Sequence, residues 1–183
     1  YSLSQIVHLL ESTGLAFDPD MVILPYYIES AAPYFDQVPL GRFGRASFLF
    51  HLVQAYYDNI LHEPCRLRAA FYRPHSLHRV VELALGRLRL LEQLHGFSAF
   101  VAIVPMVHDF SDPLCQRLHR QARELSRRLG LRTRDLLDRF RGDDPRQYLQ
   151  PSEVFDLIHA NPAFHRKLGE LLADWVRPQI PTR

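Results

Sequence analysis

The residues MVIL at positions 21–24 and FSAFVAIV at positions 97–104 decide the expected fold. Both runs are short and mostly apolar, and a proline ends each of them, Pro25 the first and Pro105 the second. Neither run alternates regularly between apolar and polar residues, which is typical of strands buried on both faces of a parallel sheet. Parallel strands need long crossover connections, usually helical, so the sequence predicts an α/β fold.

Four segments around these strands place apolar residues at helical spacing. We expect helices at about 2–13, 77–95, 111–129 and 163–176. Ser2 and Gln5 have capping-box spacing at the start of the first helix, and Gly96 suits the end of the second. The spacing further predicts a helix within 44–60, a weaker third strand within 131–137 and a polar loop over 141–152.

The composition favours one globular domain over residues 1–183, with 47% hydrophobic and 23% charged residues. The net charge of +2 gives no reason to expect a nucleic-acid partner, and we interpret the ten arginines between 117 and 146 as a solvated face. No apolar run approaches the roughly 18 residues of a membrane helix. The two cysteines, Cys65 and Cys115, are expected as buried free thiols, with a single bridge between them as the alternative, which leaves the compartment open.

The sequence DLIHANPAFH at residues 156–165 is the strongest candidate for chemistry. Asp156 precedes His159 by three residues, just before the last helix, and on a loop its carboxylate can hold the imidazole for proton transfer. The alternative is that Asp156 caps a turn and that His159 is a polar loop residue. We expect the loop at the carboxyl end of the parallel sheet, where α/β folds bind ligands.

This stretch resembles the last conserved block of the SGNH (GDSL-type) hydrolases, with Asp156, His159, Asn161 and His165 at the positions of that block. Residues 1–6, 17–24, 100–105 and 131–140 resemble further segments of the family, in the same order. The resemblance implies a three-layer α/β/α, flavodoxin-like fold. It also implies hydrolysis or acyl transfer on carboxylic esters, including O-acetyl groups on sugars. In that mechanism His159 is the base, Asp156 orients it, and neither a cofactor nor a metal is expected.

The chain also departs from the family. No segment corresponds to the block with the nucleophilic serine, so we expect the serine and the first strand to lie outside these 183 residues. Glu29 stands where the family has an oxyanion-binding asparagine, and a carboxylate there would repel an oxyanion. The alternative function is therefore a non-catalytic SGNH-like binding or assembly module.

Residues near the expected strand ends are candidates for a substrate pocket that takes a small-molecule or carbohydrate ester. They are Tyr26, Tyr27, Glu29, Ser30 and Asn161. The segment 26–72 holds 11 of the 21 aromatic residues, which either wall such a pocket or pack an irregular insertion. Without the family's first strand, the strand at 20–25 has an open edge, and we expect an upstream segment or a second copy of the chain to cover it.

Overall fold

The computed structural model of the protein describes residues 2–28, 77–107, 110–149 and 160–180. Its centre is a parallel sheet with the strand order β1-β2-β3. The strands are β1 (Met21–Tyr27), β2 (Ser98–Val104) and β3 (Arg132–Asp135). In the register, Met21 lies opposite Ser98, and Phe100 lies opposite Arg132. These pairings confirm an α/β fold with a parallel sheet.

The four helices that the sequence predicts in the described ranges are present. They are α1 (Leu3–Ser12), α4 (Leu77–His95), α5 (Pro113–Arg128) and α6 (Pro162–Val176). Short 3₁₀ helices follow several elements, namely η1 (Gly14–Phe17), η5 (Leu137–Arg139), η6 (Pro145–Tyr148) and η7 (Arg177–Gln179). Because η6 lies inside the expected polar loop, that loop is partly ordered as helix. The helix expected within 44–60 lies outside the described residues. None of the described helices combines the length and the apolarity needed to cross a membrane.

Local signals explain where the helices begin and end. The Ser2 backbone N–H donates to Gln5 Oε1 at 2.8 Å while the Gln5 N–H donates to Ser2 Oγ at 3.3 Å, so the expected capping box is present. Asp112 Oδ1 accepts from the Leu114 N–H at 2.8 Å and caps α5. Gly96 follows α4 with a φ of +75°, a conformation that glycine adopts without steric cost.

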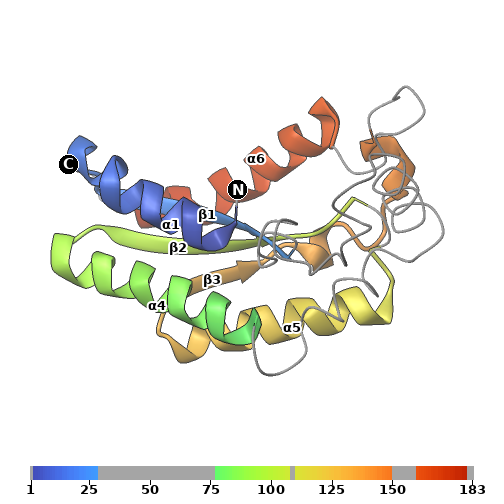
Figure 1. Ribbon diagram of the computed structural model, residues 1–183. Helices are drawn as coiled ribbons and strands as arrows, with labels where there is room; N and C mark the ends of the chain where they lie inside the picture. Colours follow the sequence, from blue (N-terminus) through green and yellow to red (C-terminus); the bar gives the residue numbers. More distant parts are fainter. Residues whose placement is uncertain (1, 29–76, 108–109, 150–159, 181–183) are drawn as a thin grey trace, which may run out of the picture.

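The helices cover both faces of the sheet and make three layers (Figure 1). On one face, α1, α4 and α5 share a core with alternate strand residues such as Leu24, Val101 and Ile103. On the other face, α6 packs with η5 and η6 against Ala102 and Val104. This alternation follows from the period of two along a strand.

The first strand differs from its expectation in length and in burial. It continues through Pro25 to Tyr27, and Ile23 is 38% exposed, so β1 is not buried on both faces. In the described sheet β1 pairs only with β2 and is therefore an edge strand. An edge strand tolerates proline because the backbone N–H groups on one side have no ladder partner. The strand therefore extends two residues past the end expected at Pro25.

The expectation of free thiols is also wrong for Cys115. This residue lies on the buried side of α5 and is disulfide-bonded. The sequence contains one other cysteine, Cys65, which lies outside the described residues.

Glu92 ties α4 to the starts of two strands. Its carboxylate is 7% exposed, and Oε1 accepts from the Ala99 N–H and from Arg132 Nη1, both at 2.9 Å. Oε2 accepts from Arg89 Nη1. The buried Glu92 carboxylate thus accepts a backbone hydrogen bond at the start of β2 and balances the charge of Arg132 on β3.

We predict that Glu92→Ala lowers the free energy of unfolding by about 2–4 kcal/mol, because it leaves the buried Ala99 N–H and two arginines without their acceptor. Glu92→Gln keeps an acceptor and should cost less. The control is Glu11→Gln, which breaks the exposed pair with Arg87 and should leave the free energy nearly unchanged. Urea unfolding measures all three variants, and equal losses for Glu92→Ala and Glu11→Gln would contradict the prediction.

Candidate functional site

The carboxyl ends of the three strands lie together at one end of the sheet, at the right of Figure 1. Ligands of open α/β sheets bind at this carboxyl end. The structure places Tyr26, Tyr27 and Asn161 here, among the residues that the sequence analysis selected. Asp156, His159, Glu29 and Ser30 lie outside the described residues, so the catalytic pair and two of the five pocket residues stay predictions.

The two tyrosines at the end of β1 belong to opposite faces of the sheet. Tyr26 is fully buried in the core that contains α1, α4 and α5. Tyr27 is partly buried and packs against the cluster that contains α6. The sequence analysis grouped them in one pocket, but strand alternation separates them. Of the two, Tyr27 shares the face with the segment that leads into α6.

Asn161 uses every hydrogen-bonding position of its side chain on the backbone. Its Oδ1 accepts from the N–H groups of Ala163 at 3.0 Å and Phe164 at 3.1 Å, which caps α6. Its Nδ2 donates to the carbonyl oxygens of Gln147 at 2.7 Å and Leu149 at 3.1 Å. A contact between Asn161 and substrate stays a prediction, and the structure adds a role in holding two segments together.

The same residues join the two ends of segment 150–159. Leu149 and Ala160 form an isolated antiparallel bridge, and the Asn161 N–H donates to the Tyr148 carbonyl at 2.8 Å. The segment that carries Asp156 and His159 therefore begins and ends at one place in the fold.

Four aromatic rings pack together beside the two ends of segment 150–159. Phe140 lies at the centre, with its ring centroid 5.4 Å from Phe110, 5.6 Å from Tyr148 and 5.0 Å from Phe164. Phe110 follows β2, Phe140 follows β3, and Phe164 is on α6, so the cluster connects the carboxyl ends of two strands to the last helix. Edge-to-face and tilted pairs at these separations are favourable beyond the area that they bury.

Lys167, the single lysine of the chain, crosses from α6 to the same cluster. Its ammonium pairs with Asp143 and lies 4.7 Å from the Phe140 ring centroid. The Tyr148 hydroxyl donates to the same Asp143 oxygen at 2.5 Å. Partial burial raises the pKa of the Asp143 carboxyl, but the hydrogen bonds from Lys167 and Tyr148 outweigh it and lower that pKa overall. The carboxylate thus holds α6 and η6 together.

The sequence analysis missed a buried pair, His119 and Asp135. His119 Nδ1 lies 2.7 Å from Asp135 Oδ1, and the two side chains are 2% and 8% exposed. The same oxygen accepts from the Leu137 N–H at 3.1 Å, and Arg123 lies 3.9 Å from Asp135 Oδ2. The sequence feature that could have indicated this burial is the position of His119 on the apolar stripe of α5, between Leu118 and Ala122. Its burial keeps the pair from contact with a substrate and makes it a link between α5 and β3.

This pair predicts a pH dependence of stability. Burial raises the pKa of the Asp135 carboxyl, but the hydrogen bond and the charge of His119, the Leu137 N–H and Arg123 lower it overall. A carboxyl whose pKa is lower in the folded state stabilises the protein above its unfolded pKa, and this contribution disappears as the pH falls through the folded pKa. We expect Asp135→Asn to cost about 1–3 kcal/mol at pH 7 and progressively less on acidification below about pH 4.

Urea unfolding of the parent and of Asp135→Asn between pH 7 and pH 3 measures this difference. The control is Asp138→Asn, since Asp138 pairs with Arg141 at 3.1 Å on the exposed surface, where an ion pair contributes little. A difference between parent and Asp135→Asn that stays constant over this pH range would contradict the prediction.

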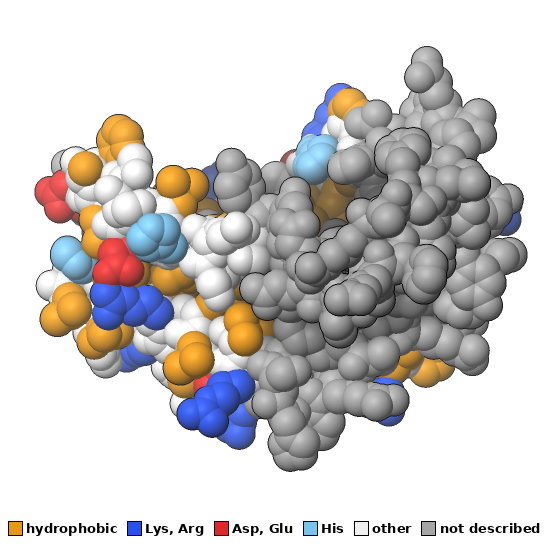
Figure 2. Space-filling view, viewed as in Figure 1, with side chains coloured by type: hydrophobic (Ala, Val, Ile, Leu, Met, Phe, Trp, Pro, Cys, Tyr) orange, Lys and Arg blue, Asp and Glu red, His pale blue; other side chains and the backbone are white. Residues whose placement is uncertain are grey.

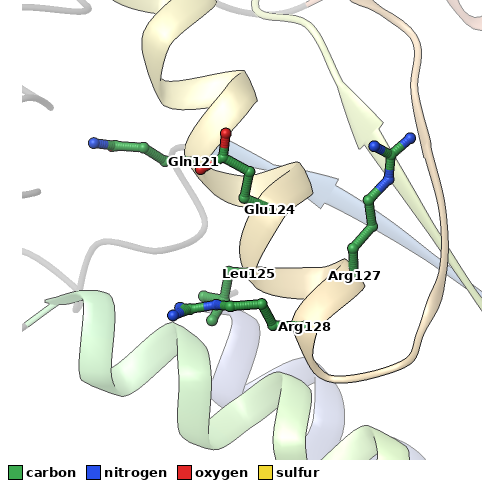
Figure 3. A pocket seen from close by; sticks show the side chains of 5 residues that line it. All are labelled: Gln121, Glu124, Leu125, Arg127 and Arg128. Carbon is green, nitrogen blue, oxygen red and sulfur yellow. The ribbon is translucent and has the colours of Figure 1, made fainter.

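A cavity of about 490 Å³ lies at the opposite end of the molecule, beside the last turns of α5. Its lining residues are Gln121, Glu124, Leu125, Arg127 and Arg128. Figure 3 shows that Gln121 and Arg128 project to one side of α5 and that Arg127 projects to the other. The lining consists mostly of exposed polar side chains. They lie near the amino ends of the strands, away from the carboxyl ends where a ligand is expected. Among the described residues, no group of three His, Cys, Asp or Glu side chains gathers as a metal site.

The outer surface of α1 and α4 carries exposed apolar side chains. Leu9, Leu83, Leu90 and Leu94 are each more than two-fifths exposed. Figure 2 shows the apolar side chains of this region among charged ones, at the left of the view. The pair of Arg87 and Glu11 joins the two helices here. No group on this surface points to a ligand among the residues that the structure describes.

Comparisons with protein-family models, with curated proteins and with solved structures found no match for this chain.

Proposed function

We propose that this chain forms part of an SGNH-type domain that hydrolyses or transfers acyl groups of carboxylic esters, with His159 as general base and Asp156 as its orienting carboxylate. The observation that carries the proposal is that the residues on either side of segment 150–159 are hydrogen-bonded to each other. The contacts of Leu149, Ala160 and Asn161 hold both ends of this segment beside the carboxyl ends of β2 and β3. Catalytic groups of α/β enzymes lie at this carboxyl end of the sheet.

In the proposed reaction, His159 accepts the proton of a serine hydroxyl while the serine oxygen attacks the ester carbonyl. The tetrahedral intermediate collapses, the bond to the alcohol oxygen breaks, and the leaving alcohol takes the proton from His159. Water or an acceptor alcohol then attacks the acyl-serine, with His159 again moving the proton. Asp156 holds the imidazole in the required tautomer and stabilises its protonated form. Because these 183 residues contain no segment like the family's serine block, the serine would come from outside them.

The arrangement of β1 supports a role for Tyr27 in the substrate pocket. Tyr27 packs on the sheet face that α6 covers, and His159 lies two residues before the cap of α6. Tyr26 packs on the other face and would instead support the strand. Glu29 and Ser30 follow Tyr27 closely in the sequence and would lie near it. An O-acetylated sugar or another small ester fits a pocket with aromatic and polar walls.

A fluorophosphonate probe tests the proposal on the complete natural protein, because this class of reagent forms a covalent bond with activated serines. We expect one serine to be labelled, together with release of acyl groups from small esters or acetylated sugars. His159→Ala should abolish both. Absence of labelling and of turnover in the folded parent would contradict the proposal and favour the alternative, a non-catalytic binding or assembly module, which Glu29 at the oxyanion position also favours.

A further inference from the structure

We propose that the outer face of α4 binds the α4 of a second copy of the chain, with the two helices antiparallel about a two-fold axis near Arg87. This surface is separate from the carboxyl end of the sheet and from the edge of β1. The proposal therefore does not depend on the proposed function.

Helix α4 presents apolar side chains on two of its faces. One face packs in the core against the sheet. The other carries exposed apolar side chains, namely Val80 (39%), Leu83 (65%), Leu90 (41%) and Leu94 (66%). Together with Arg87, these positions are separated by three, four, three and four residues, the spacing with which two helices pack side by side. Figure 2 shows apolar side chains along this helix among charged ones, at the lower left. Contiguous exposed apolar surface of this kind marks an interaction site.

The stripe is nearly symmetric about Arg87. Leu83 lies four residues before it and Leu90 three residues after it, while Val80 and Leu94 lie seven residues away on either side. When two such helices run antiparallel about an axis at Arg87, Leu83 meets Leu90 of the second copy, and Val80 meets Leu94. Two-fold dimers are built on self-complementary surfaces of this type. The symmetry of the stripe therefore favours a second copy of the chain over an unrelated helix.

The charge at the centre of the stripe is balanced within each copy. The Arg87 guanidinium donates to both carboxylate oxygens of Glu11 on α1, with Nε at 3.3 Å from Oε2. At the two-fold axis, two arginines and two glutamates would meet, and their charges sum to zero. A polar group at the centre of an apolar helix contact also fixes the register of the two helices.

Gly86 is an independent observation that points to a close neighbour. Glycine inside a helix is destabilising relative to alanine. A Cβ added to Gly86 would meet no atom within 4 Å, so the surroundings of Gly86 in one copy do not require a glycine. Gly86 lies beside Arg87 and one helical turn from both Leu83 and Leu90, at the centre of the proposed contact. The missing side chain lets the backbone of a second helix approach there.

Sedimentation of the complete natural protein and of Leu83→Lys tests the proposal. We expect the parent to be a dimer at micromolar concentration, and Leu83→Lys to raise the dissociation constant by about 100-fold, because both copies carry the change. Leu83 is largely exposed, so one copy should keep its fold, which circular dichroism checks. The control is Ile180→Lys, since Ile180 is 56% exposed and follows α6 and η7, away from α4. A monomeric parent up to about 100 µM, or equal dissociation constants for the two variants, would overturn the proposal.

Cross-linking tests the antiparallel arrangement. A mixture of Leu83→Cys and Leu90→Cys, treated with a short bismaleimide, should form cross-linked dimers faster than either variant alone, with the parent as background. Faster cross-linking of Leu83→Cys alone would indicate parallel helices and overturn the two-fold arrangement.

Gly86→Ala tests the close approach of the two helices. Alanine strengthens the helix equally in monomer and dimer, so the dissociation constant reports only the contact between copies. We expect this constant to rise by about tenfold, because the new methyl group separates the backbones. An unchanged or lower constant would overturn the close approach at Gly86.

Discussion

Replacing His159 with alanine in the complete natural protein is expected to lower kcat/KM for ester hydrolysis by about 10⁴-fold or more. In the proposed mechanism the imidazole accepts the serine proton during attack and returns it to the leaving alcohol, and the variant lacks a group for this transfer. Asp156→Asn should give a loss of similar order, because an amide favours the wrong histidine tautomer. Initial rates with an activated ester and with an acetylated sugar measure both effects.

The control for this prediction is His95→Ala. His95 is an exposed histidine in the last turn of α4, at the amino ends of the strands. Its replacement should leave kcat/KM unchanged. If His159→Ala retained more than about a tenth of the parent activity, general base catalysis by His159 would be refuted, since such a base contributes at least about 10²-fold.

The second large effect concerns stability. We expect Phe140→Ala to lower the free energy of unfolding by about 3–5 kcal/mol. Phe140 is fully buried, and its ring contacts those of Phe110, Tyr148 and Phe164 and the ammonium of Lys167. Removing the ring leaves a cavity at the point where the carboxyl ends of β2 and β3 meet α6. The rings around it can collapse only partly, because each belongs to a different segment.

Thermal and urea unfolding of Phe140→Ala can be compared with Phe17→Ala. Phe17 is 80% exposed at the end of η1, so the same truncation there removes little buried area and should change the free energy by less than about 0.5 kcal/mol. A loss for Phe140→Ala below about 1.5 kcal/mol would show that the four rings do not act as one packed unit.

Features whose partners lie a few residues away were predictable from the sequence. The Ser2–Gln5 capping box, the Asp112 cap and the glycine after α4 each depend on local geometry, and each is present. The strand at 97–104 was predictable because a run of this kind must be buried in a sheet. The parallel pairing followed from the helices between the strands.

Features that depend on distant partners were not predictable in this way. The extension of β1 through Pro25 follows from its edge position, which is defined only once β2 has paired. His119 and Asp135 are sixteen positions apart and meet because α5 packs on β3. For Asn161, the proline that follows it could have indicated a helix cap. Its bonds to Gln147 and Leu149 depend on the fold, and the sequence analysis placed it only in the substrate pocket.

The three helices that share one face of the sheet determine the direction in which it can be extended. Strand–helix–strand connections between parallel strands are right-handed in about 98% of cases. The chain steps from β1 to β2 and from β2 to β3 in the same direction, with α4 and α5 on the face where α1 also lies. A parallel strand joined to β1 through α1 would follow the same handedness and add on the side of β1 away from β2. In a sheet enlarged this way β1 is an interior strand, and Pro25, which has no N–H, leaves one of its ladder hydrogen bonds unmade.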